Sequence, residues 1–168
     1  EFNVKTAIYP FANQTPDFSL RNGGLIEQAG FYAPLSANSE GLRFYVIDTS
    51  TQKAWVNIDN GVSGLYGSVR PIPINATVRP GWFQFKITTV NERKAVMDFL
   101  DLIPNGHYIA VTNTPAAPST YLPTVWQADT SVHGSGISLY HKLFNAGFVT
   151  IDNLQSYVPF IFVYKKGT

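Results

Sequence analysis

The chain of 168 residues contains no cysteine. Disulfide bonds, thiolate metal sites and a cysteine nucleophile are therefore excluded, although this absence does not fix the cellular compartment. Charged residues make up only 14% of the chain and the formal net charge is +1, which gives no electrostatic case for nucleic acid as a partner. The sequence also has no apolar run close to the roughly 18–20 residues of a membrane-spanning helix, so we expect no membrane insertion.

Apolar and aromatic side chains are abundant instead. Apolar residues account for 45% of the chain and aromatic residues for 14%, so we expect one domain with a substantial core. The aromatic share indicates either an aromatic β core or a surface that recognises flat ligands. The sequence starts with EFNVKTAIYP and stops just after a strand-like run. We therefore expect residues 1–168 to be a single module excised from a larger protein.

Runs of β-branched and aromatic residues, bounded by turn residues, predict five strands. These strands cover residues 42–48, 53–58, 81–89, 107–113 and 158–166. The short polar connection between the first two predicts a β-hairpin. The unbroken apolar run of the last predicts a strand that is covered on both faces.

The remaining segments are richer in turn residues. Glycine and proline predict long loop insertions at 60–81 and 113–136. Residues 17–20 and 29–35 are weaker strand candidates.

Apolar residues at helical spacing predict a helix that starts at Asn91, its expected N-cap, and stops at Pro104. Its apolar stripe consists of Ala95, Val96, Phe99, Leu100 and Ile103. Its charged residues lie off this stripe, and the two aspartates are predicted to be solvated: Arg93, Lys94, Asp98 and Asp101. A second helix is predicted over 136–145, with Gly147 as its stop. Its expected inward residues are Leu139, Tyr140, Leu143 and Phe144. Together these elements predict an α+β fold, with β-sandwich-like antiparallel sheets and two or three helices.

The segment 126–143 has the composition closest to that of an enzyme site. It holds Asp129, His133, Ser135, Ser138 and His141. A serine-hydrolase elbow needs G-x-S-x-G after a strand, and this segment has neither the spacing nor the strand. No zinc or calcium spacing, P-loop or dinucleotide fingerprint is present, so we expect no metal and no cofactor. A small hydrolase that uses Asp129, His133 and either serine remains the less favoured alternative to a capped turn.

Trp126 is the most informative of the three tryptophans. It lies in a polar segment beside Gln127 and Asp129, an arrangement suited to stacking on the apolar face of a sugar ring. The alternative is that Trp126 anchors a loop by inserting into the core.

Four segments occur in an order that resembles the interleukin-like EMT inducer (ILEI) domain. They are EGLRFYVIDTSTQKAW, ERKAVMDFLDLIPNGHYIAVTN, LYHKLFNAGF and VPFIFVYKKG. The resemblance covers residues 41–168, and residues 1–40 are assigned as preceding strands of the same sandwich. More specifically, the sequence is similar to modules of Bacteroidetes surface proteins that are related to type IX secretion sortase and gingipain-type peptidases.

This resemblance implies a non-catalytic domain of two packed antiparallel sheets with a few helices. A related stem domain of a mammalian O-mannose N-acetylglucosaminyltransferase is lectin-like and uses a loop carboxylate and a strand arginine. In this chain Asn113 and Tyr157 stand at those two places. A sugar site is therefore expected on the insertion loops instead. Its expected residues are Trp126, Asp129, Asn113 and Arg70.

The resemblance also implies a function. It predicts a non-catalytic binding or accessory module, outside the cell or on the cell surface of a bacterium, whose partner is a glycan or a neighbouring domain of the parent protein. The alternative is a structural spacer domain of a peptidase-like type IX secretion protein.

Overall fold

The structure is a computed structural model that describes residues 2–4, 18–21, 25–29, 41–57, 65–67, 81, 83–113, 122–154 and 160–168. Its strands are β1 (Phe2–Val4), β2 (Phe18–Arg21), β3 (Leu25–Ala29), β4 (Leu42–Asp48), β5 (Lys53–Ala54), β6 (Phe83–Phe85), β7 (Tyr108–Asn113) and β8 (Ile161–Lys165). Its helices are α1 (Val90–Leu102), α2 (Pro123–Ala128), α3 (Thr130–His133), α4 (Leu139–Asn145) and the 3-10 helix η2 (Ile151–Asn153).

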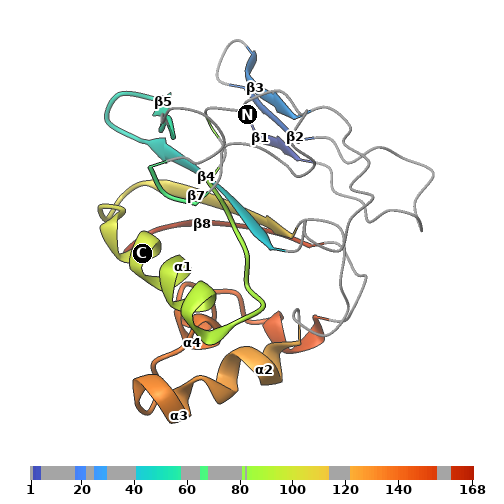
Figure 1. The fold of residues 1–168 in the computed structure, drawn as a ribbon. Coiled ribbons are helices and arrows are strands. Elements are labelled where there is room, and N and C mark those ends of the chain that lie inside the picture. The colour runs from blue at the N-terminus through green and yellow to red at the C-terminus, as the bar shows by residue number, and fades with distance from the viewer. Residues whose placement is uncertain are drawn as a thin grey trace, which may run out of the picture.

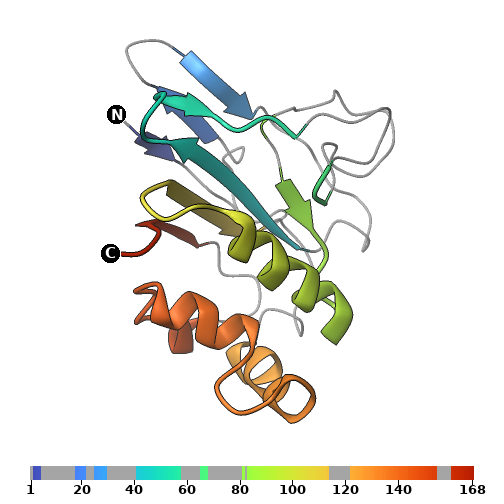
Figure 2. The same ribbon diagram turned by 90° about the vertical axis from the view of Figure 1, so that its left-hand side faces the viewer.

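These elements form an α+β fold (Figure 1). A five-stranded antiparallel sheet has the order β5-β4-β7-β8, and β6 also pairs with β4. A smaller antiparallel sheet consists of β1, β2 and β3. Figures 1 and 2 both show α1 and α4 beyond the β7–β8 side of the large sheet, with α2 and α3 farther out. The helices therefore gather on one side of the described part of the fold.

The predicted hairpin is confirmed, because β4 pairs with β5 in an antiparallel register that sets Ile47 opposite Ala54. The predicted strands at 81–89 and 107–113 are confirmed as β6 and β7. β8 lies within 158–166, but Val163 and Lys165, which share one face of the strand, are exposed. The expectation that both of its faces are covered is wrong. An unbroken apolar run did not distinguish a strand with one exposed face from a strand covered on both faces.

The N-terminal predictions are tested only in part. The weak strand candidate at 17–20 corresponds to β2. β3 ends at Ala29, and the rest of the candidate at 29–35 lies outside the described residues.

The N-cap of helix α1 lies two residues earlier than predicted. Its N-cap is Thr89, whose hydroxyl accepts from the Glu92 N–H while the Glu92 carboxylate accepts from the Thr89 N–H. This reciprocal pair is a capping box, and it replaces the expected cap at Asn91. Asp98 and Asp101 are exposed, as predicted.

The buried side of α1 is rotated relative to the predicted stripe. Ala95 is exposed, whereas Met97 and Arg93 are buried. Arg93 belongs to the buried side because it is three and four residues from Val96 and Met97, which share its side of the helix. The placement of Arg93 away from the apolar stripe is therefore wrong.

The core between α1 and the sheet is aromatic, as the composition indicated. The ring of Phe99 lies 4.9 Å from that of Phe83, 5.1 Å from Phe85 and 5.8 Å from Phe44, centroid to centroid. Tilted and edge-on contacts dominate this cluster, and such geometries add to the stability gained from burial alone. Phe99 thus fixes α1 against β4 and β6.

The segment 113–136 is not simply a loop. It contains α2 and α3, and Pro123 stands at the start of α2, where a missing N–H removes no helical hydrogen bond. The insertion predicted at 60–81 falls mostly outside the described residues.

Candidate functional site

Trp126 does not form a stacking platform. It lies in α2, and its exposed fraction is 0%. Pro123 and Trp126, three residues apart, are the buried residues of this helix. A sugar ring needs an accessible indole face, which Trp126 does not offer. The exposed-loop interpretation is wrong, and the alternative of a core anchor describes its position.

Asp129 is also buried, and both of its carboxylate oxygens are bound by Arg93. Arg93 donates from Nε to Asp129 Oδ2 at 2.6 Å and from a terminal nitrogen to Oδ1 at 2.8 Å. The other terminal nitrogen donates to the carbonyls of Ile87 and Thr88. The exposed fractions of the two side chains are only 4% and 2%. This bidentate clamp joins α1 to the α2–α3 junction, so the assignment of Asp129 to a ligand site is not supported by its geometry.

Of the remaining two expected residues, the structure describes only Asn113. Asn113 is buried at the end of β7, where its Oδ1 accepts from the Phe160 N–H at 3.0 Å. Arg70 lies outside the described residues. The three placed residues are buried, with exposed fractions of 5% or less, and they occupy packing positions.

The hydroxyl and imidazole groups of 126–143 also fail to form a catalytic chain. Ser138 is the N-cap of α4, its Oγ lies 2.8 Å from His141 Nδ1, and its exposed fraction is 0%. A nucleophile must reach its substrate, so this pair acts as a helix cap. His133 Nε2 is buried without a hydrogen-bond partner, and both Asp129 carboxylate oxygens bind Arg93. No group of three or more metal-ligating side chains occurs among the residues that the structure places.

Three other acidic residues have partners within the fold. Asp98 forms an exposed pair with Lys94 one helical turn away, and Asp101 pairs with Lys142 of α4. Asp48 accepts from the side chain and the backbone of Ser50. These hydrogen bonds lower the pKa of the Asp48 carboxyl to about 2, because they stabilise its charged form. Asp48 therefore stabilises a turn.

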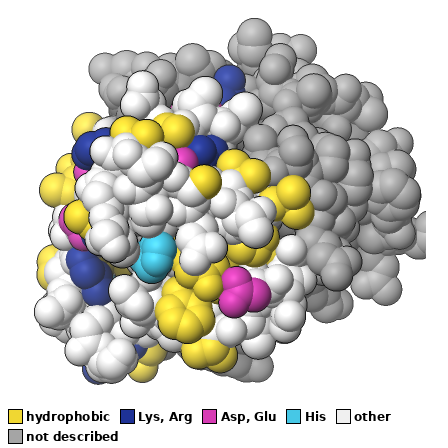
Figure 3. Space-filling model, turned by 90° about the horizontal axis from the view of Figure 1, so that it is seen from below, with side chains coloured by type: hydrophobic (Ala, Val, Ile, Leu, Met, Phe, Trp, Pro, Cys, Tyr) yellow, Lys and Arg dark blue, Asp and Glu magenta, His cyan; other side chains and the backbone are white. Residues whose placement is uncertain are grey.

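An aromatic surface on α4, exposed at Phe144, is the most site-like arrangement in the described part of the chain. It consists of Tyr140, which is itself buried, together with His141, Phe144 and Asp152, and is called the α4 surface below. Phe144 is 39% exposed, and its ring stacks on that of Tyr140 with centroids 5.8 Å apart and planes 10° apart. His141 meets Tyr140 edge-on at 5.2 Å. Figure 3, which views the helical side, shows hydrophobic side chains gathered beside an acidic side chain and a histidine.

Hydrogen bonding orients this surface. The Tyr140 hydroxyl donates to Asp152 Oδ2 at 3.2 Å, which fixes the aromatic pair of α4 against η2. Burial, together with the hydrogen bond to Asp152 and its charge, raises the pKa of the Tyr140 hydroxyl, which therefore stays protonated as the donor. The second Asp152 oxygen has no hydrogen bond among the described residues. The α4 surface thus combines a flat apolar face with groups that accept or donate hydrogen bonds.

Sequence reasoning missed this surface because it assigned Phe144 to the core. The i,i+4 spacing of Tyr140 and Phe144 was a usable signal for a ring pair on one side of a helix. No spacing rule places Asp152 next to them, since it follows α4 after a turn.

The helices of the described segments include none that is long and apolar enough to span a membrane. Comparison with known proteins gives no relative: no family model, no curated protein and no solved structure matches this chain. The ILEI resemblance therefore stays a prediction.

Proposed function

We propose that this chain is a non-catalytic binding module that recognises a glycan through the α4 surface. The observation that carries the proposal is the Phe144 ring, which is exposed on one side and stacked on Tyr140 on the other. Such a supported ring offers the flat apolar face on which the C–H side of a sugar packs. Asp152 and His141 both contact Tyr140, the ring on which Phe144 stacks, and can serve as partners for sugar hydroxyl groups.

The expected affinity is low. One face of the Phe144 ring covers about 75–125 Å², half of a buried aromatic side chain, which at roughly 25 cal/mol per Å² contributes about 2–3 kcal/mol. A hydroxyl hydrogen-bonded to the Asp152 carboxylate adds about 1.5–3 kcal/mol. The sum of about 3.5–6 kcal/mol corresponds to a Kd between a few millimolar and a few tens of micromolar, before the cost of association is subtracted. A module of this kind acts through several copies or through the larger protein that carries it.

The wider assignment follows the resemblance. It comprises an ILEI-like sandwich, in which the small sheet β1–β3 supplies the second layer, and a place outside the cell or on the surface of a bacterium with type IX secretion. The structure has a hairpin, helix α1 followed by strand β7, helix α4 and closing strand β8, and these element types support the assignment because the resemblance implies them in this order.

The test is an amide NMR titration with common monosaccharides and oligosaccharides at up to tens of millimolar. We expect saturable shifts at 140–145 and 151–153, and loss of saturation in Phe144→Ala. The control is Val132→Ala, which removes an apolar side chain that is 65% exposed on α3 and should titrate like the parent. No shift with any sugar would reduce the chain to the alternative, a structural spacer domain.

A further inference from the structure

Asp152 differs from the other acidic side chains whose surroundings the structure describes. Each of the others binds a cation or a backbone N–H: Asp48, Glu92, Asp98, Asp101 and Asp129. Asp152 is exposed, and its hydrogen bond within the described segments comes from the uncharged Tyr140 hydroxyl, at 3.2 Å. Its negative charge is therefore accessible to a ligand.

The sequence around Asp152 contains no opposite charge. Residues 143–164 include neither lysine nor arginine, and Asp152 is the one charged residue among them. The segment on either side of Asp152 therefore cannot supply an ammonium or guanidinium group to neutralise it.

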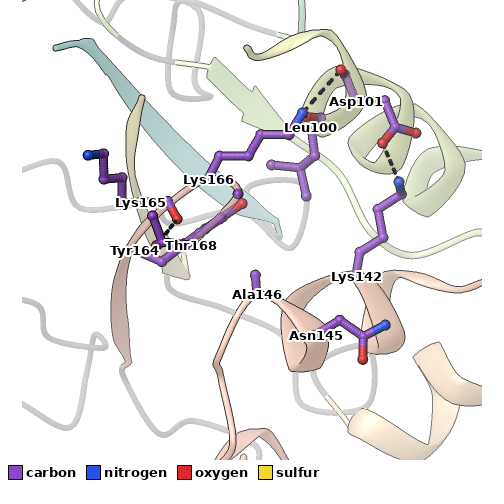
Figure 4. A pocket seen from close by; sticks show the side chains of 10 residues that line it. Leu100, Asp101, Lys142, Asn145, Ala146, Tyr164, Lys165, Lys166 and Thr168 are labelled. Atoms are coloured by element: carbon purple, nitrogen blue, oxygen red, sulfur yellow. Dashed lines mark hydrogen bonds and ion pairs between the residues drawn. The ribbon is translucent and has the colours of Figure 1, made fainter. Parts of the chain in front are cut away.

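The lysine of α4 lies on the other side of the helix. Lys142 is two residues from both Tyr140 and Phe144, which places it about 160° from each around the helix. It pairs with Asp101, and Figure 4 shows it extending from α4 toward α1. With His141 neutral, the four residues of the α4 surface carry one negative charge and no positive charge.

The ring pair of the α4 surface has the same electrostatic preference as its carboxylate. The face of an aromatic ring is the negative part of its quadrupole, and it attracts a cation that lies within about 6 Å of the ring centroid. Tyr140 joins the two features, because its ring stacks on Phe144 and its hydroxyl donates to Asp152. The aromatic pair and the carboxylate therefore both favour an ammonium group and both disfavour an anion.

We propose that the α4 surface selects glycans that carry an unacetylated amino sugar, and that Asp152 determines this specificity. The inference rests on the proposed function, since the C–H face of the sugar packs on Phe144. The ammonium group of the sugar lies toward Asp152, and direct contact is not required, because a charge acts over about 8 Å at physiological ionic strength. Attraction to an exposed carboxylate and to a ring face raises the affinity about three- to tenfold above that of the neutral sugar.

The test compares glucosamine, N-acetylglucosamine, glucose and glucuronate in amide NMR titrations of the whole chain at pH 7. N-acetylglucosamine is the matched ligand, because it keeps the ring and the nitrogen of glucosamine but has no charge. We expect glucosamine to bind about three- to tenfold more tightly than N-acetylglucosamine, and glucuronate to bind most weakly. The shifts should lie at 140–145 and 151–153.

A pair of variants tests the role of Asp152. Asp152→Asn keeps an oxygen that can accept from the Tyr140 hydroxyl and removes the charge, so glucosamine and N-acetylglucosamine should then bind with the same affinity. Asp98→Asn is the matched control. It removes an exposed carboxylate of α1 and changes the net charge equally, and it should leave the preference for glucosamine intact.

The outcomes separate this inference from the proposed function. Equal binding of glucosamine and N-acetylglucosamine by the parent chain overturns the inference and leaves glycan binding standing, whereas the absence of shifts with every sugar overturns both. The inference also fails if Asp98→Asn removes the preference as fully as Asp152→Asn does. It fails again if Nα-acetyl-lysine amide binds the same residues as tightly as glucosamine, since the α4 surface would then recognise a peptide ammonium instead of a sugar.

Discussion

The Arg93–Asp129 clamp predicts a large loss of stability from one substitution. Asp129→Ala leaves the buried guanidinium with only the carbonyls of Ile87 and Thr88 as acceptors. Breaking a buried ion pair in this way costs about 3–5 kcal/mol, against a total free energy of unfolding of about 5–15 kcal/mol. For a chain of this length, the loss corresponds to a fall of roughly 6–20 °C in Tm.

Urea unfolding followed by tryptophan fluorescence measures this loss by linear extrapolation. The matched control is Asp98→Ala, which removes one partner of the exposed Lys94–Asp98 pair and should change the free energy of unfolding by less than about 0.5 kcal/mol. The double variant Arg93→Met/Asp129→Leu should recover at least about 1 kcal/mol of the loss, since an apolar pair leaves no buried charge. If Asp129→Ala lowers the free energy of unfolding by no more than Asp98→Ala does, the Arg93 guanidinium reaches solvent in the variant, and the expected cost of breaking the clamp is refuted.

Two further substitutions test smaller features. Thr89→Ala removes the capping box of α1 and should lower the free energy of unfolding by about 1 kcal/mol, whereas Thr89→Ser keeps the hydroxyl; equal losses in both would show that the cap hydrogen bond is not the cause. The Asp48 carboxyl has a folded-state pKa of about 2, below its ordinary 3.8, so its contribution to stability is complete above pH 3.8 and is lost as the pH falls through about 2. Ser50→Ala should raise this pKa, which NMR titration of the Asp48 side chain measures, and should move the loss of stability to higher pH. An unchanged titration curve would contradict this reasoning.

Local sequence patterns predict those elements that are long enough to show a repeated spacing of apolar residues. The 13 residues of α1 complete more than three turns, so their apolar spacing predicted the helix. The hairpin of β4 and β5 followed from two strand-like runs around a short polar turn. The errors in α1 concern its cap and its rotation. Arg93 is buried because it binds Asp129, which lies 36 residues later in the sequence. Helical spacing rules consider only residues of the same helix, so they could not predict this partner.

The site was harder to predict, for a related reason. The six residues of α2 make less than two turns, too few for a periodic stripe to appear. Its segment therefore resembled a loop, and Trp126 resembled an exposed ring. Pro123 was the available signal, because proline is favoured at the first position of a helix. Phe144 was predicted to be buried but is exposed. The prediction grouped it with its neighbours Leu143 and Tyr140, which are buried.

The exposure of Phe144 follows from the packing of α4. Leu139 and Leu143, one turn apart, are fully buried and set the rotation of the helix, whereas the partly exposed Lys142–Asp101 pair contributes little to it. At 3.6 residues per turn, Phe144 is about 140° from Leu139 and about 100° from Leu143 around the helix, but only about 40° from Tyr140. The side chain of Phe144 therefore leaves the buried side of α4, and Tyr140, tied to Asp152, is the ring on which it stacks. The burial of the two leucines thus presents the Phe144 ring to solvent.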